Sequence, residues 1–253
     1  MTNDIAIEVR GFSQSFGEVR KIRSLDLDVH RNEILGIIGP ARSGKSTFLC
    51  ALNRLNDLVR GSRREGTVRI DGRDIYGPDV DVVALRRKLG MVFATPVPLP
   101  RSIFENVAFG ARMAGVHSRE RLDALVRDSL EKGGLWDEVQ DRLDTSGLKL
   151  SGGQQQRLCL ARILAVAPEF ILLDEPTSGL DPISTMKIEE SLRRLKKDYT
   201  IILVTNNTKQ AARVADRTAF FLGGRLVEVG LTAKIFTAPD DQRTDDYLRG
   251  KFG

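Results

Sequence analysis

Three short stretches of the chain alternate apolar and polar residues: Ile5–Val9, Leu25–Val29 and Thr67–Gly72. A period of two is typical of a strand with one face buried, so we expect half-buried antiparallel strands here. Two other stretches, Phe170–Leu173 and Ile201–Val204, are continuously apolar. Such runs are typical of strands covered on both faces in a parallel sheet. The chain therefore predicts two kinds of sheet.

Helical spacing of apolar residues runs from about Ser102 to Ala165, where Leu122, Leu125, Val126 and Leu130 fall on one face. A further helical stretch covers 183–195, and Gly223-Gly224 predicts a hairpin turn. This order predicts an α/β fold in a single domain, 1–253. Residues 1–93 and 166–253 would form a core with an antiparallel β subdomain, and residues 94–165 an inserted helical subdomain.

A glycine-rich loop follows the apolar run Ile34–Ile38 and has the spacing G-x-x-x-x-G-K-S/T of a P-loop. The loop consists of Gly39, Pro40, Ala41, Arg42, Ser43, Gly44, Lys45, Ser46 and Thr47. Its backbone N–H groups can surround a polyphosphate, Lys45 can reach the outer phosphates, and the Ser46 hydroxyl can bind Mg²⁺. The alternative is a glycine-rich turn with a surface lysine. The loop predicts nucleotide binding, with ATP and Mg²⁺ as cofactors.

Two carboxylates, Asp174 and Glu175, follow the apolar run Phe170–Leu173. Ligands of open α/β sheets bind beyond the carboxyl ends of the strands, so Asp174 can meet Mg²⁺ near Ser46. Glu175 would then polarise a water molecule aimed at the terminal phosphate. The alternative is that the paired acids merely cap the strand.

Composition and charge argue against some classes of protein but do not identify a particular function. The 253 residues carry a net charge of +5, with acidic and basic residues interspersed and no basic cluster interleaved with aromatic residues. We therefore expect no nucleic-acid partner. No apolar run approaches the roughly 18 residues that span a bilayer, and Met1–Arg10 lacks the layout of a signal peptide. Both observations favour a cytosolic chain.

The segment Leu150–Gln154 is the most informative about which class of nucleotide-binding protein this is. Ser151, Gly152, Gly153 and Gln154 stand at the expected start of a helix, where free N–H groups bind anions. With the sequel Gln155–Arg157, the segment resembles the signature of the ABC ATPase superfamily. The resemblance implies that two subunits join head to tail, each P-loop facing the partner's Ser151 and Gly153 across ATP. It also implies that Asp181, in the segment 178–181, crosses this interface, and that Phe16 stacks on adenine rather than packing in the core.

Within that superfamily the whole chain resembles the ATP-binding subunit of Pst-type phosphate importers. The similar segments are Leu52–Asn56, Ser102–Ala108, Leu135–Val139, Asp141–Leu143, Gln154–Cys159, Asp181–Ser184, Lys196–Thr200, Ala211–Val214 and Tyr247–Gly253. The resemblance implies an ATPase on the cytoplasmic face of the inner membrane that drives phosphate uptake through an integral-membrane permease. The segment Thr95–Ile103 and the helical piece would dock the permease.

Two positions depart from the family's pattern. Ala94 stands where the family has a glutamine that touches Mg²⁺ and the attacking water, and Asn206 stands where it has a histidine that contacts the terminal phosphate. We therefore expect ATP binding with slow hydrolysis, in a homodimer or in a heterodimer with a related ATPase. Ala41 and Arg42 should be tolerated if their backbone angles are ordinary. A regulatory subunit that holds ATP without turnover is the alternative, and an ABC protein of DNA repair or translation is a further rival.

Overall fold

The computed structural model describes residues 4–252; Met1–Asn3 and Gly253, which the predicted single domain includes, lie outside this range. A four-stranded antiparallel sheet has the order β2-β1-β4-β5. Its strands are β1 (Ile5–Phe16), β2 (Val19–His30), β4 (Ser62–Ile70) and β5 (Arg73–Asp74). The three alternating stretches of the sequence lie in β1, β2 and β4, which pair antiparallel as predicted.

A second sheet of six strands has the order β10-β9-β3-β8-β7-β6. Its strands are β3 (Ile34–Ile38), β6 (Leu89–Val92), β7 (Phe170–Asp174), β8 (Thr200–Val204), β9 (Arg217–Leu222) and β10 (Arg225–Leu231). The neighbours from β9 to β6 pair parallel. The continuously apolar stretches are buried on both faces in β7 and β8, as predicted. The predicted turn at Gly223-Gly224 joins β9 to the antiparallel edge strand β10, and both glycines have positive φ.

Helices cover both faces of the second sheet. The helices outside residues 94–165 are α1 (Lys45–Leu52), η1 (Leu55–Leu58), α2 (Val82–Lys88), α7 (Pro182–Leu195), α8 (Thr208–Val214), α9 (Thr232–Thr237) and α10 (Gln242–Leu248). Phe48 of α1 packs in one apolar cluster with residues of both sheets, among them Phe12 and Leu35. The helix α1 is therefore held between the two sheets, and the loop that precedes it is held with it.

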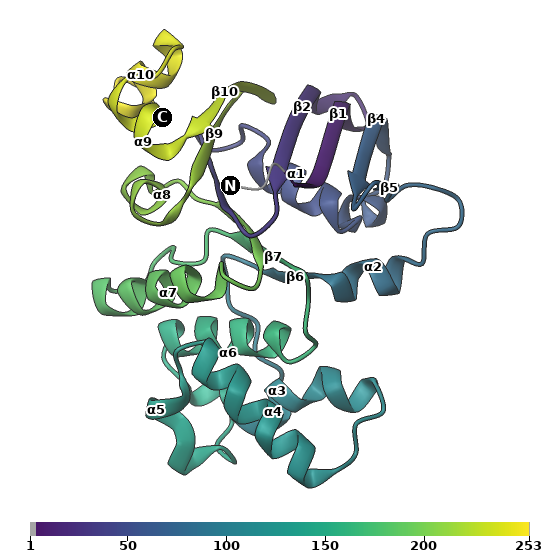
Figure 1. Cartoon of the computed structure of the whole chain (residues 1–253), viewed down its shortest axis with the longest axis vertical. Helices are drawn as coiled ribbons and strands as arrows, with labels where there is room; N and C mark the ends of the chain where they lie inside the picture. The colour runs from purple at the N-terminus through teal and green to yellow at the C-terminus, as the bar shows by residue number, and fades with distance from the viewer. Residues whose placement is uncertain (1–3, 253) are drawn as a thin grey trace.

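The remaining helices gather at the end of the molecule remote from the antiparallel sheet (Figure 1). They are α3 (Ile103–Met113), α4 (Arg119–Lys132), α5 (Trp136–Val139), η2 (Gln140–Arg142), η3 (Gly147–Lys149) and α6 (Gly152–Leu164). Leu122, Val126 and Leu130 of α4 are buried in an apolar cluster whose members all lie between residues 103 and 165. Across residues 4–252, none of the helices combines the length and the apolar character that crossing a bilayer requires.

The pattern of the sequence does not predict β5 and α2. The helix α2 begins where the Asp81 carboxylate accepts hydrogen bonds from the backbone N–H groups of Val83 and Ala84. This capping contact satisfies two of the free donors at the start of the helix. Only Leu85 of α2 is buried, so the segment has too few core positions to show a helical period.

Candidate nucleotide site

The loop between β3 and α1 adopts a conformation that depends on its glycines. Gly39 has φ 145°, and a Cβ there would lie 2.1 Å from the carbonyl oxygen of Phe221 in β9. Gly44, with φ 104°, begins α1. Larger residues would clash or be strained at both positions. The buried Lys45 donates hydrogen bonds from Nζ to the carbonyl oxygens of Gly39 (2.7 Å) and Pro40 (2.9 Å), which closes the loop into a ring.

A hollow of about 120 Å³ opens on this loop, lined by Lys21 of β2 and by residues 42–47. Burial lowers the pKa of Lys45, while the negative charges of Glu175 and Asp174 raise it in part. The hollow therefore combines backbone N–H groups at the start of a helix with basic side chains. Such a combination binds phosphate groups.

The side chains of Ser46 and Asp174 meet at the carboxyl ends of β3 and β7. Ser46 Oγ donates a hydrogen bond of 2.9 Å to Asp174 Oδ1. Burial raises the pKa of Asp174, and the bond from Ser46 and the charge of Lys45 oppose this shift. A hydroxyl and a carboxylate are the oxygen ligands that Mg²⁺ takes, together with water and substrate phosphates. Over residues 4–252 no group of three or more His, Cys, Asp or Glu side chains could hold a metal.

Glu175 stands in a left-handed backbone conformation (φ 50°) directly after β7. Its N–H donates to the carbonyl oxygen of Val204 (2.8 Å), and its carboxylate Oε2 accepts from the backbone N–H of Asn206 (3.0 Å). Burial and the charge of Asp174 raise the pKa of Glu175, against the effects of the Asn206 N–H and Lys45. A carboxylate with a raised pKa is a better proton acceptor for a water molecule.

These contacts place Lys45, Ser46, Asp174, Glu175 and the backbone of Asn206 around one point. The Asn206 side chain is exposed and makes no hydrogen bond within the described part of the chain. Ala94, two residues after the end of β6, offers no donor or acceptor from its side chain. The neighbouring carbonyl oxygen of Phe93 accepts a hydrogen bond from Gln156 Nε2 of α6 (2.8 Å). Asn206 thus contacts Glu175 of the predicted site through its backbone, and Ala94 follows β6, the strand paired with β7.

Arg42 has an uncommon backbone conformation for a residue with a side chain. It has φ 64°, in the left-handed region, so the condition of ordinary backbone angles, on which its tolerance depended, is not met. This region costs a side-chain-bearing residue roughly 1–2 kcal/mol. The turn from Pro40 to Ser43, closed by a hydrogen bond from the Ser43 N–H to the Pro40 carbonyl oxygen (3.3 Å), imposes the conformation.

The hairpin between β9 and β10 forms one wall of the loop. The Gly224 N–H donates to the carbonyl oxygen of Ser43 (3.1 Å), and the Gly224 carbonyl oxygen accepts from the N–H of Arg23 (2.8 Å). A Cβ on Gly224 would lie 2.6 Å from the carbonyl oxygen of Lys21. The phosphate loop is therefore fastened to segments from both sheets.

The predicted second anion site forms the start of α6. Ser151 Oγ accepts from the Gln154 N–H (3.3 Å), and Gln154 Oε1 accepts from the Ser151 N–H (3.1 Å), which together make a capping box. Ser151 and Gly152 are exposed, and Gly153 is buried. A Cβ on Gly153 would lie 2.3 Å from Ser184 Oγ, so the signature segment lies directly against the start of α7.

Glu138 of α5 connects the start of α6 to α7 through hydrogen bonds that the sequence does not predict. Its carboxylate accepts two hydrogen bonds from Arg157 (2.6 and 3.1 Å), one from Gln154 Nε2 (2.9 Å) and one from Lys187 of α7. These bonds, those of Arg157 first, lower the pKa of Glu138 to about 2. The Gln154 side chain is thus already engaged by Glu138 and Ser151.

Ser151, Asp181 and Phe16 are among the predicted residues that do not line the hollow at the P-loop. Ser151 and Asp181 are exposed, and Asp181 caps α7 by accepting from the Ser184 N–H (2.9 Å). Phe16 is half-buried at the end of β1 and belongs to none of the apolar clusters of residues 4–252. Both interpretations of Phe16, stacking on adenine and packing in the core, therefore stay predictions, as do the roles of Ser151 and Asp181.

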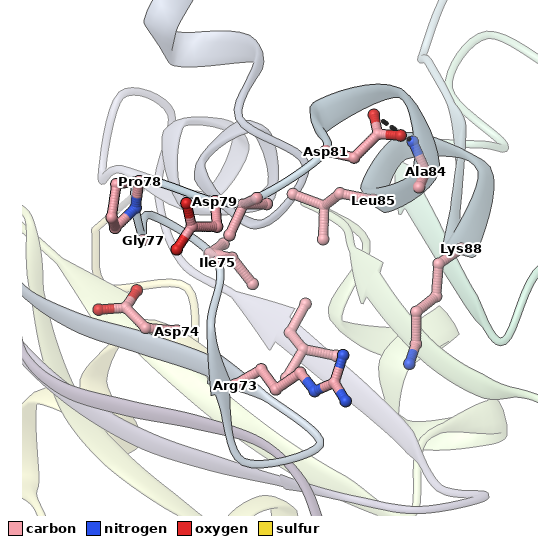
Figure 2. Close-up of a pocket in the computed structure, with 12 residues that line it drawn as sticks. Arg73, Asp74, Ile75, Gly77, Pro78, Asp79, Asp81, Ala84, Leu85 and Lys88 are labelled. Carbon is pink, nitrogen blue, oxygen red and sulfur yellow. Dashed lines mark hydrogen bonds between the residues drawn. The ribbon is translucent and has the colours of Figure 1, made fainter.

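A larger hollow, of about 590 Å³, lies between β5 and α2 and contains none of the predicted site residues. Figure 2 shows its lining, with the Asp81 carboxylate bonded to the N–H of Ala84 (3.1 Å) at the start of α2. Lys88, at its edge, is already paired with Asp71 and Glu169. Lys88 and Asp81 therefore have structural partners.

The fold and the loop together define a P-loop NTPase with the core of the ABC ATPases. The family model described as ABC transporter matches residues 22–178, and the chain belongs to this family. The chain is thus the ATP-binding domain of a transporter, of a family that binds and hydrolyses ATP.

Solved structures agree with this assignment. The chain is similar to CbiO1 from Clostridium perfringens, part of the ABC transporter complex CbiONQ, with 24% identity and a TM-score of 0.82 over 97% of this chain and 96% of that one. It is also similar to the ATP-binding cassette MJ0796, solved as a dimer in a post-hydrolysis state with ADP and Pi. Here the identity is 28% and the TM-score 0.76, over 89% of this chain and 98% of that one.

A third similar structure is a bacterial Atm1-family ABC exporter with ATP bound. The identity is 27% and the TM-score 0.81; the match covers all of this chain and 43% of the exporter chain. The present chain therefore spans less than half the length of that protein. Of these similar proteins, MJ0796 was solved as a dimer, and CbiO1 is part of a transporter complex.

Proposed function

We propose that this chain is the ATP-binding subunit of an ABC importer that hydrolyses ATP to drive inorganic phosphate through an integral-membrane permease. The observation that carries the ATPase part is the contact of Ser46 with Asp174, 2.9 Å apart, beside Lys45 and Glu175. The phosphate importer is supported by the Pst-like segments of the sequence. The subunit would lie at the cytoplasmic face of the membrane, against the permease.

The proposed reaction is ATP + H₂O → ADP + phosphate. Lys45 and the N–H groups of the loop hold the phosphates, and Ser46 and Asp174 would hold Mg²⁺, which when bound neutralises charge on the phosphates. Glu175 accepts a proton from the attacking water. The N–H of Asn206 fixes the Glu175 carboxylate through a hydrogen bond of 3.0 Å.

A second subunit would complete each site. The exposed Ser151 and Gly152, with the backbone of Gly153, stand at a helix start suited to an anion. The start of α6 in the partner subunit would bind the terminal phosphate. The two subunits would form a homodimer or a heterodimer with a related ATPase, and Asp181 would lie at their interface. We further propose that residues 94–165 form the helical subdomain that meets the permease, since Val97 of the segment Thr95–Ile103 is 62% exposed.

Hydrolysis would be slow because two side chains that face developing charge are missing. Removing one such group typically lowers the rate by about 10²–10³, and two losses need not multiply. Ala94 has no side-chain donor or acceptor to replace the family's glutamine. The exposed Asn206 cannot become a cation as the family's histidine can. ATP binding depends on Lys45 and the loop and would persist.

Single-turnover hydrolysis by the purified protein tests this proposal against the double variant Ala94→Gln, Asn206→His. We expect the double variant to hydrolyse ATP at least tenfold faster, because both missing groups are restored. Equal rates would contradict the proposed effect of the two positions. Growth of a deletion strain on limiting phosphate tests the solute: normal growth and uptake would contradict phosphate import.

A second candidate function is a regulatory subunit that holds ATP without turnover. Ala94 and the unbonded Asn206 side chain favour it, and the intact Glu175 argues against it. ATP-stabilised dimers with negligible release of phosphate, from both the wild type and the double variant, would support this function over the first.

A further inference from the structure

The carboxylate of Glu138 holds the start of α6 at two points. It accepts a hydrogen bond from Gln154 Nε2 (2.9 Å) and two from the guanidinium of Arg157 (2.6 and 3.1 Å). Arg157 Nε in turn donates to the carbonyl oxygen of Gly153 (3.3 Å). A side chain and a backbone group of the signature segment are therefore both tied to Glu138, which lies on α5, outside that segment.

These contacts decide which donors at the start of α6 stay available to a ligand. The Gln154 amide is used at both ends, because its Oε1 accepts from the Ser151 N–H (3.1 Å) and its Nε2 binds Glu138. Ser151 Oγ accepts from the Gln154 N–H (3.3 Å), so its own proton can still be donated. Gly152 and Gly153 stand in the first turn of α6, where N–H groups have no partner within the helix.

The Glu138 side chain is also fixed from the side of α7. Lys187 donates to Glu138 Oε1, and Gly153 lies directly against Ser184, one turn before Lys187. The Arg157 side chain is only 2% exposed, so water cannot replace the carboxylate that neutralises it. Segments of three helices meet at Glu138, and its loss would loosen the start of α6.

Resting on the proposed function, we propose that Glu138 is a positioning residue for the ATP of the partner subunit, because it holds the start of α6 so that the donors of residues 151–153 address one phosphate group. Without the carboxylate, Arg157 lacks its counter-charge and Gln154 lacks its acceptor. The donors would then sample more orientations, and ordering them on binding costs affinity. The loss would appear in the site of the partner, since residues 151–153 serve the opposite subunit.

Subunits that carry different substitutions separate the two sites of a dimer. Lys45→Ala disables the P-loop of its own subunit, so a mixed dimer with one intact P-loop holds one ATP, which faces the start of α6 in the Lys45→Ala subunit. Adding Glu138→Gln to that same subunit changes the segment that faces the ATP. Placing Glu138→Gln in the other subunit changes the segment that faces the disabled P-loop.

The measurement is the fluorescence anisotropy of a labelled Lys45→Ala subunit, titrated with unlabelled subunits in Mg²⁺ and ATP. Adding Glu138→Gln to the labelled subunit should weaken its binding to wild-type subunits about tenfold, the loss of one charge-assisted hydrogen bond. Placed in the unlabelled subunit instead, Glu138→Gln should leave the binding unchanged. A purely structural role would weaken both pairs alike, because each contains one Glu138→Gln subunit.

Two further variants serve as controls. Glu131→Gln removes an exposed carboxylate of α4 that pairs with Arg127 (2.8 Å), and it should change neither pair. A thermal melt shows whether Glu138→Gln is folded. If it is not, Gln154→Met takes its place, because it removes the link to Gln154 and keeps the ion pairs of Glu138. It should weaken binding about tenfold in the labelled subunit only.

The outcomes separate this inference from the proposed function. Wild-type protein that binds no ATP, or binds it equally well after Lys45→Ala, would overturn the proposed function. Wild-type protein that binds ATP but does not capture the labelled subunit would overturn the shared site, and this inference with it. Equal binding with and without Glu138→Gln in the labelled subunit, or equal losses in both arrangements, would overturn the role of Glu138 alone.

Discussion

Replacing Glu138 with glutamine removes one negative charge from a half-buried cluster of ion pairs while preserving the shape of the side chain. Glu138 faces Arg157, whose side chain is only 2% exposed, and it also binds Lys187 and Gln154. Arg157 keeps its bond to the carbonyl oxygen of Gly134 (2.6 Å) in the variant but loses its counter-charge. An uncompensated buried charge destabilises the folded state.

The lowered pKa of Glu138 gives the size of the expected loss in the free energy of unfolding. A fall from 4.5 to about 2 corresponds to at most about 3.4 kcal/mol, at about 1.36 kcal/mol for each pKa unit. Because the Glu138 side chain is 27% exposed, screening by solvent reduces this to about 2 kcal/mol. A lowered carboxyl pKa stabilises the folded state above the unfolded pKa, and the stabilisation is lost as the pH falls from about 4.5 through about 2.

Urea unfolding at pH 7 measures the effect. We expect Glu138→Gln to lower the free energy of unfolding by about 2 kcal/mol, and the difference from the wild type to shrink to roughly 60% of this at pH 3.5. The control Glu190→Gln removes an exposed carboxylate of α7 and should stay within about 0.5 kcal/mol of the wild type. A Glu138→Gln protein as stable as the wild type at pH 7, or a difference that grows in acid, would refute the reasoning.

Two further substitutions test the tip of α6 and the proposed metal ligands. Gly153→Ala would place a Cβ 2.3 Å from Ser184 Oγ, whereas Gly152→Ala meets nothing nearer than 3.6 Å. We expect the first to lower the free energy of unfolding by about 1–3 kcal/mol and the second far less; equal urea midpoints would contradict the contact. Ser46→Ala removes the hydroxyl 2.9 Å from Asp174, so Mg²⁺ should tighten ATP binding less than in the wild type, as titrations with Mg²⁺ and with EDTA would show. An unchanged Mg²⁺ effect would exclude Ser46 as a ligand.

Local patterns predict the sheets because burial imposes them directly. The runs in β7 and β8 are apolar since both of their faces are covered. The loop between β3 and α1 is predictable for a different reason: its spacing reflects backbone requirements, and Gly39 and Gly44 have the positive φ that glycine permits. The meeting of Ser46 with Asp174 then follows from the rule for the carboxyl ends of parallel strands.

Other features depend on contacts between distant segments and leave no local trace. Glu138 reaches Arg157 and Lys187 across 19 and 49 positions of the chain, and no spacing encodes such a junction. The left-handed conformation of Arg42 is imposed by the turn around it, because arginine itself does not favour it. The strand β1 extends to Phe16 through several irregularities of register, which break the alternation that the sequence shows only up to Val9.

The turn at Gly223-Gly224 changes what protein engineering can do with this molecule. Tight surface turns are ordinarily good places to insert a tag or a fluorescent reporter, or to open the chain for circular permutation. Here Gly224 bonds to Ser43 and Arg23, so inserted residues would push on the wall of the phosphate loop. The loop around Gly115, where an added Cβ meets nothing within 4 Å, is the better attachment point for a probe.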